Sequence, residues 1–141
     1  MEAKVVWQDG MAFQAHLEDF SFIIDAAESV GGRNLGPRPK GLTLVSLAGC
    51  TAMDVVSILK KMRVDFESFE VVTQGTLAQN HPKKFDEIVI RYQFKGADVP
   101  LDKVKHAIGL SMETYCGVSA TLRPGVKISH QVFINDRKVD G

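Results

Sequence analysis

The segment Gly41–Met62 constrains the fold most, because its apolar residues recur every three or four positions, the period of an α-helix. The faces outside this pattern are also mostly small or apolar, and Asp54 is the only charged residue before Lys60. A helix that is apolar on all sides is buried on all sides. We therefore expect a long central helix, buried in the protein core or at a subunit interface.

A membrane span is the alternative interpretation of the same segment. Leu42–Leu59 has nearly the length that a bilayer requires. However, a central aspartate such as Asp54 costs about 2.5–3.5 kcal/mol on insertion scales, and strand patterns flank the segment on both sides. We expect no membrane association and a helix that is buried in protein.

Alternation of apolar and polar residues, the period of a half-buried strand, predicts strands on both sides of this helix. The expected strands are Lys4–Gln8, Met11–Leu17, Phe20–Ile24, Glu70–Leu77, Asp86–Lys95 and Val126–Ile134. Asp9-Gly10 favours a tight hairpin turn. Pro100 suits the first turn of a second helix, Leu101–Tyr115, which Gly117 closes as a left-handed cap. The resulting order, βββ-α-ββ-α-β, predicts an α+β fold.

The balance of charges limits the partners of this chain. The 17 Lys and Arg residues against 17 Asp and Glu residues give a formal net charge of zero. The chain thus lacks the positive excess that binds nucleic acid and the basic clusters that hold a protein to an anionic membrane. No repeat or low-complexity stretch interrupts residues 1–141, so we expect a single domain. The N-terminus lacks the pattern of a secretory signal, which predicts a cytoplasmic protein.

Two cysteines are the candidates for chemistry, Cys50 in the long apolar helix and Cys116 at the end of the second helix. In a reducing cytosol, a catalytic or redox pair is favoured over a structural disulfide. The alternative is two buried free cysteines that pack like small hydrophobic residues. The four histidines show no zinc-ligand spacing, so the two thiols lack the further ligands of a zinc site. We expect neither a metal nor a cofactor.

A reactive Cys50 requires a cation that stabilises its thiolate. Arg33 and Arg38, in the glycine- and proline-rich segment before the helix, are the nearest candidates in sequence, although arginines of such a loop are often only solvated. Asp54 follows Cys50 by one helical turn, so its carboxylate would raise the pKa of the thiol unless it points elsewhere. His130 lies on the apolar side of its strand and is expected to be a core histidine rather than a catalytic one.

Two motifs resemble those of a known family. The stretch GPRPKGLTLVSLAGCTAMDVVSILKK resembles the central helix of the OsmC/Ohr family, the osmotically inducible and organic hydroperoxide resistance proteins, and SMETYCGVSATL resembles its second cysteine motif. The spacing of the cysteines and the order of the elements also agree, so the resemblance covers essentially the whole chain. It implies an intertwined homodimer, with its two central helices packed together between β-sheets.

The resemblance also implies a thiol-dependent peroxidase that reduces small organic hydroperoxides or hydrogen peroxide. By position, Cys50 matches the peroxidatic cysteine and Cys116 the resolving one, and a dithiol reductant restores both. The peroxidases of this family hold an arginine from their N-terminal strands over the sulfur with a glutamate. Here Lys40 stands at the glutamate position, and Met1–Asp25 contains no arginine. The alternative is a non-enzymatic protein of the same fold that binds an apolar ligand at the dimer interface or senses redox state.

Overall fold

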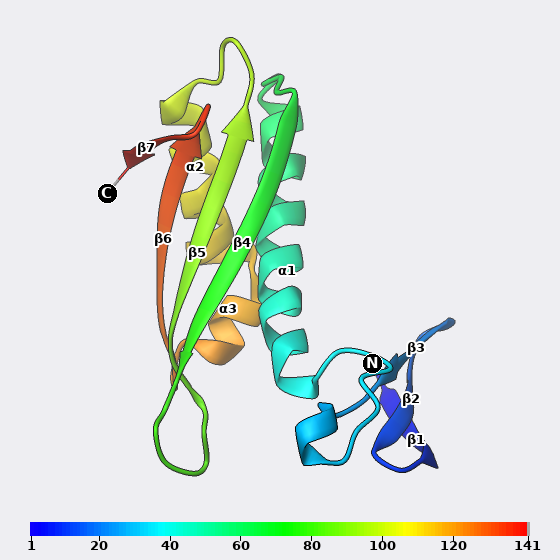
Figure 1. Cartoon of the computed structure of the whole chain (residues 1–141). Helices are drawn as coiled ribbons and strands as arrows, with labels where there is room; N and C mark the ends of the chain where they lie inside the picture. Colours follow the sequence, from blue (N-terminus) through cyan, green and yellow to red (C-terminus); the bar gives the residue numbers. More distant parts are fainter. Residues whose placement is uncertain (141) are drawn as a thin grey trace. The chain divides into compact units, whose positions relative to one another are not determined.

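Two β-sheets and three α-helices, of which α1 is the longest, form the computed structural model, which describes residues 1–140 (Figure 1). The chain divides into an N-terminal unit, Met1–Thr43, and a C-terminal unit that starts at Leu44. The division falls within the first turns of helix α1 (Pro39–Lys61). The α+β fold expected from the sequence is confirmed.

The N-terminal unit is a three-stranded antiparallel sheet in the order β1-β2-β3. Its strands are β1 (Ala3–Asp9), β2 (Ala12–Leu17) and β3 (Phe20–Ile24). The hairpin turn predicted at Asp9-Gly10 is present, and Gly10 has a φ of 58°, a conformation that glycine adopts without steric cost. A short 3-10 turn, η1 (Glu28–Val30), follows in the loop before α1.

The buried carboxylate of Asp25 organises the loop between β3 and α1. It accepts hydrogen bonds from the backbone amides of Ala26, Arg33 and Leu35, at 2.7, 3.1 and 3.2 Å. Burial raises the pKa of Asp25, but the three amides together outweigh it, so the pKa lies below its ordinary value. The loop therefore closes around one ionised side chain.

The C-terminal unit is a four-stranded sheet in the order β4-β5-β6-β7. Its strands are β4 (Ser68–Leu77), β5 (Phe85–Lys95), β6 (Lys127–Ile134) and β7 (Arg137–Asp140). The pairing is antiparallel except between β5 and β6, which run parallel and are connected through helical segments. Helices α1 and α2 (Leu101–Leu110) lie on one face of this sheet (Figure 1). Every second residue of β5 is buried beneath them, namely Ile88, Ile90, Tyr92 and Phe94.

Within the single chain the long helix α1 is buried on one face, and burial of its other faces at a subunit interface stays a prediction. Its buried residues are Leu47, Thr51, Val55 and Leu59. On other faces Val45 is 65% and Met53 is 75% exposed. By length and composition alone α1 could also cross a membrane, but Leu47, Val55 and Leu59 belong to the apolar core that α1 forms with the sheet. Apolar side chains of α1 outside this face therefore remain exposed in the described chain.

The second expected helix ends differently from its prediction. It consists of α2 and a five-residue π-helical turn, η2 (Ser111–Tyr115), and Gly117 does not close it as a left-handed cap. Instead, Cys116 is extended, and Gly117 begins another short helix, α3 (Gly117–Leu122). The sulfur of Cys116 accepts a hydrogen bond from the backbone amide of Ser119 and so caps α3. This side-chain cap starts a new helix at Gly117, the position at which the sequence had predicted the end of a helix.

Candidate active site

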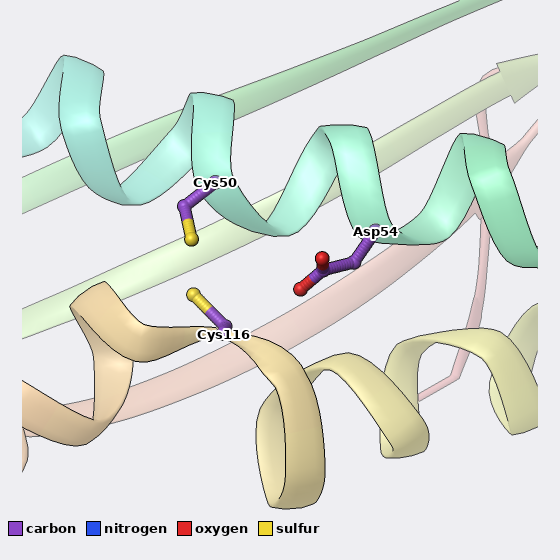
Figure 2. Close-up of side chains that lie close together, drawn as sticks. All are labelled: Cys50, Asp54 and Cys116. Atoms are coloured by element: carbon purple, nitrogen blue, oxygen red, sulfur yellow. The ribbon is translucent and has the colours of Figure 1, made fainter.

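The structure brings the two cysteines together. Cys50 on α1 and Cys116 between η2 and α3 direct their sulfur atoms toward one another, and the carboxylate of Asp54 points into the same space (Figure 2). The two sulfurs and a carboxylate oxygen lie within 4.8 Å of one another. Both thiols are free, with Cys116 buried and Cys50 half-buried. Reagents from solution therefore reach Cys50 more readily than Cys116.

The surroundings of Cys50 favour its neutral thiol. Burial is the largest influence and raises the pKa of Cys50. The backbone amide of Val118 donates to the sulfur and lowers this pKa, whereas the Cys116 thiol and the Asp54 carboxylate raise it. The net pKa is above the ordinary value, and the contribution of Asp54 has the sign that its one-turn spacing predicted. Reaction at neutral pH thus requires that a proton be taken from the thiol.

Three buried hydroxyl groups extend from Asp54 to the middle of the sheet, and we call them the hydroxyl chain: Ser111, Thr51 and Tyr92. Ser111 Oγ donates to Asp54 Oδ2 at 2.9 Å. Thr51 Oγ1 lies 2.8 Å from Ser111 Oγ and 2.7 Å from Tyr92 Oη. Burial raises the pKa of Tyr92 above its ordinary value, so this phenol keeps its proton at neutral pH. These three residues were not predicted as site residues from the sequence, although polar side chains at core-facing positions were a signal.

The two candidate arginines belong to the N-terminal unit, and both are exposed. Arg33 forms an ion pair with Asp9 at 3.6 Å, and Arg38 donates to the carbonyl oxygen of Gly36 at 2.9 Å. The groups that shift the pKa of Cys50 all come from the C-terminal unit. The role of Arg33 and Arg38 at Cys50 therefore stays a prediction.

His130 is exposed, so its assignment to the core was wrong. Strand β7 pairs with β6 only as far as Val132. Among the described residues, no strand therefore pairs with this edge of β6 at His130. The imidazole ring lies edge-on to the ring of Tyr92, with the centroids 6.0 Å apart. The exposed His130 thus contacts the ring of the buried Tyr92.

The cysteine pair and Asp54 also form a possible set of metal ligands. Two thiolates and a carboxylate suit a borderline cation such as Zn²⁺, with one position left open. The spacing of the cysteines and histidines alone predicted no metal site, because the carboxylate of Asp54 was not counted as a ligand. Both thiols must lose their protons to bind a metal, so binding would compete with their redox chemistry.

The comparisons with known proteins assign the fold to a family. The family described as "OsmC-like protein" matches residues 31–131, and the chain belongs to this family. The resemblance found in the two cysteine motifs is thereby confirmed.

Curated relatives and solved structures agree with this assignment. Protein YhfA of Escherichia coli (strain K12) is 32% identical over 130 residues, which are 92% of this chain and 95% of YhfA. A hypothetical protein from Aquifex aeolicus VF5 has a similar crystal structure, with a TM-score of 0.78 and 29% identity, covering 95% of this chain and 96% of that one. An organic hydroperoxide resistance protein OsmC from Legionella pneumophila gives a TM-score of 0.70 at 16% identity, covering 94% and 95%. At that identity the last comparison shows the fold alone.

Proposed function

We propose that the protein is a thiol-dependent peroxidase that reduces small organic hydroperoxides or hydrogen peroxide. The observation that carries the proposal is the pair of free thiols within 4.8 Å of each other, one half-buried and the other buried. Because Cys50 is more accessible, we assign it the attack on the peroxide and assign Cys116 the resolving step. The hydroperoxide resistance proteins among the structural neighbours support this substrate class.

The proposed reaction needs only the two sulfurs and an external reductant. The thiolate of Cys50 attacks a peroxide oxygen, the O–O bond breaks, and an alcohol or water leaves. The resulting sulfenic acid condenses with the thiol of Cys116 to give a disulfide and water. A dithiol reductant then opens the disulfide by exchange and restores both thiols. We place this cycle in the cytoplasm, where such reductants are maintained.

The raised pKa of Cys50 leaves the thiolate in need of a stabilising cation. We propose Arg38 or Arg33 for this role, with Lys40 as a third candidate, because they precede the helix that carries Cys50. Replacing the cation that acts should raise the pKa of Cys50 and slow its alkylation at neutral pH. Unchanged alkylation rates in Arg33→Ala, Arg38→Ala and Lys40→Ala would contradict the proposal.

We also propose that the protein is a homodimer. Apolar side chains are exposed on both units, including Val45 and Met53 on α1 and Trp7 and Phe20 in the N-terminal sheet. Soluble monomers rarely expose contiguous apolar patches larger than a few hundred Å². A second copy of the chain would cover such surfaces, so light scattering should give twice the mass of the chain. A monomer at micromolar concentration would contradict the dimer.

The central experiment distinguishes the two cysteines. Cys50→Ser should abolish peroxide consumption, because a serine hydroxyl does not replace a thiolate nucleophile in this reaction. Cys116→Ser should still complete the first turnover, and its Cys50 sulfenic acid should persist or proceed to sulfinic acid. Mass spectrometry should detect a Cys50–Cys116 disulfide in the wild type. An oxygen adduct on Cys116, or two unmodified sulfurs under excess organic hydroperoxide, would overturn the assignment.

A non-enzymatic binding or redox-sensing protein is the second candidate function. A cavity of about 360 Å³ in the N-terminal unit favours it, because mostly apolar residues line this cavity, among them Met11, Phe13, Ile24 and Val30. Turnover separates the two functions. A peroxidase consumes many equivalents of peroxide with excess dithiol, whereas a sensor consumes about one and stops.

A further inference from the structure

Three potential metal ligands converge on one point beside α1. Cys50 and Asp54 are four residues apart on this helix, so their side chains leave the same face. Cys116 faces them from the turn between η2 and α3 (Figure 2). The two sulfurs and a carboxylate oxygen lie within 4.8 Å of one another. The ligand atoms of a tetrahedral zinc ion lie about 3.5–3.8 Å apart, so modest side-chain rotations would bring these three onto one ion.

The carboxylate of Asp54 is already oriented by the hydroxyl chain. Ser111 Oγ donates its single proton to Asp54 Oδ2 at 2.9 Å, so it must accept the proton of Thr51. By the same reasoning Thr51 accepts from Tyr92. Carboxylates that bind a metal are themselves held by hydrogen-bonded partners of this kind. The hydroxyl chain thus fixes one oxygen of Asp54 and leaves Oδ1 for an ion.

Both sulfurs accept hydrogen bonds from backbone amides. The amide of Val118 donates to the sulfur of Cys50, and the amide of Ser119 donates to Cys116 Sγ at 3.4 Å. Such donors favour the thiolate, which is the form of cysteine that binds metals. Each of the three ligands therefore has a neighbouring group that orients it, as the ligands of metal sites do.

The charges of the three groups favour a divalent cation. Two thiolates and a carboxylate would place three negative charges within 4.8 Å, and these repel one another unless a cation lies between them. Around such an ion, Cys116 and Asp54 become co-ligands of Cys50. Sulfur ligands alone would also suit Cu(I), whereas a site that adds a carboxylate favours the borderline ion Zn²⁺.

We propose that Cys50, Cys116 and Asp54 bind one Zn²⁺ ion in the reduced protein, that the hydroxyl chain positions the carboxylate, and that oxidation of the thiol pair releases the ion. The fourth position is open to water or another small ligand. The binding of the ion stands on the geometry of the site. Its release rests on the disulfide chemistry of the proposed function.

Oxidation removes two of the three ligands at once. The two thiolates give two electrons to one hydroperoxide, the O–O bond breaks, and two protons from solvent complete an alcohol and a water molecule. The sulfurs join in a disulfide, which has no thiolate charge, so Zn²⁺ dissociates from the remaining carboxylate. A dithiol reductant restores both thiols and with them the site. While Zn²⁺ is bound it occupies both sulfurs, so the zinc-loaded protein should consume hydroperoxide more slowly than the free dithiol form.

Equilibrium dialysis of the reduced full chain against Zn²⁺ tests the site. The wild type should bind one ion per chain, and Cys50→Ser should lose this binding, because a serine hydroxyl is a poor zinc ligand. Asp54→Asn should weaken the binding at least about tenfold, the smaller effect of changing an outer-shell partner of a metal. Asp65→Asn, at an exposed position after the end of α1, is the matched control and should bind like the wild type. Equal affinities in the two aspartate variants, or less than one ion per wild-type chain, would overturn the site.

A second variant tests the hydroxyl chain without removing a ligand. Ser111→Ala should weaken Zn²⁺ binding about tenfold, as loss of an outer-shell partner does. With Co²⁺ in place of Zn²⁺, its thiolate-to-metal charge-transfer absorption should persist, because both sulfurs still bind. Ser68→Ala, at an exposed position of β4, is the control, and far-UV circular dichroism confirms that both variants are folded. Equal zinc affinities in the two serine variants would exclude the hydroxyl chain from positioning the carboxylate.

The release of zinc separates this inference from the proposed function. An organic hydroperoxide added to the zinc-loaded protein should free one ion for each disulfide formed, as measured with a zinc-sensitive dye and by mass spectrometry. An ion that stays bound after the disulfide has formed would overturn the release. A wild type that binds Zn²⁺ through the three ligands but consumes no hydroperoxide would refute the peroxidase and leave the zinc site intact. Consumption of hydroperoxide by a protein that binds no Zn²⁺ would do the reverse.

Discussion

The two units of the molecule carry similar strand patterns but bury them very differently. In the N-terminal unit the buried apolar residues are Ala12 and Ile24, while Trp7 is 63% and Phe20 is 73% exposed. In the C-terminal unit the same kind of alternation produces a continuous core between the sheet and the helices. Alternation therefore predicts that a strand forms, but it does not reveal what covers its apolar face.

The units also differ in the interactions that stabilise them. The C-terminal unit depends on apolar burial, which contributes about 25 cal/mol for each Å² removed from water. The loop of the N-terminal unit depends on the carboxylate of Asp25 and its three backbone amides. Stability from apolar burial should fall when side-chain volume is removed, whereas stability from the Asp25 hydrogen bonds should depend on pH.

Removal of core volume in the C-terminal unit should have the largest effect. Leu59 is fully buried on α1, and Leu59→Ala should lower the free energy of unfolding by about 2–5 kcal/mol. Urea denaturation followed by far-UV circular dichroism measures this change. Ser57→Ala, at an exposed position of the same helix, is the matched control and should change stability little. Equal losses in both variants would contradict the assignment of the core.

Loss of the Asp25 charge should produce a smaller effect, confined to the N-terminal unit. In Asp25→Asn the amide oxygen retains fewer of the three backbone hydrogen bonds, because only one of the two side-chain atoms accepts. Trp7 is the only tryptophan of the chain and lies in β1, so its fluorescence reports on this unit. The fluorescence transition should move to lower urea, while Leu59→Ala moves the circular dichroism transition further. A circular dichroism shift as large as that of Leu59→Ala would remove the contrast.

Acid should weaken the wild type in the same place. The pKa of Asp25 is lower in the folded protein than its ordinary value of 3.8, so this group stabilises the fold above that pH and loses the contribution as the pH falls through the folded pKa. At a fixed low urea concentration, Trp7 fluorescence should therefore change below about pH 4, the ordinary range of an aspartate. Asp25→Asn should lack this component of the titration. An identical acid transition in both proteins would assign it to other carboxyl groups.

The smallest effect on protomer stability should come from the exposed aromatic residues. Phe20→Ser should change the unfolding free energy of the protomer by less than about 0.5 kcal/mol, as exposed positions do. It should nevertheless weaken self-association if the N-terminal sheet lies in the dimer interface. Sedimentation at several concentrations measures this association. A stability loss like that of Leu59→Ala would mean that the protomer itself buries Phe20.

The strong periodic patterns allowed most of the fold to be predicted. The six expected strands and the two expected helices are present, because each has enough residues for its period to be recognised. The four-residue strand β7 was missed, since it is too short to show a pattern. Its turn consists of Asn135 and Asp136, which both have positive φ and belong to residue types that tolerate it. Helix α3 was missed because its cap is a contact of the Cys116 sulfur.

The sequence predicted only part of the candidate site. Residue type and family resemblance selected Cys50 and Cys116, and helical spacing identified the effect of Asp54. The hydroxyl chain was not identified, because Tyr92 and Ser111 are 41 and 60 positions from Thr51, their common partner. Buried hydroxyls must find partners, but the sequence does not show that these three find one another.

The position of Cys116 in the connection between two parallel strands has a consequence for the oxidised state. A Cys50–Cys116 disulfide would close a loop through α1, the β4–β5 hairpin and α2, and so restrict the unfolded chain far more than the folded one. For a loop of about 65 residues, the entropy lost by the unfolded chain corresponds to about 4 kcal/mol. Each oxidation would thus make the protein harder to unfold, and each reduction would return it to its less constrained form. The redox state of the pair would then be linked to the resistance of the whole C-terminal unit to unfolding and proteolysis.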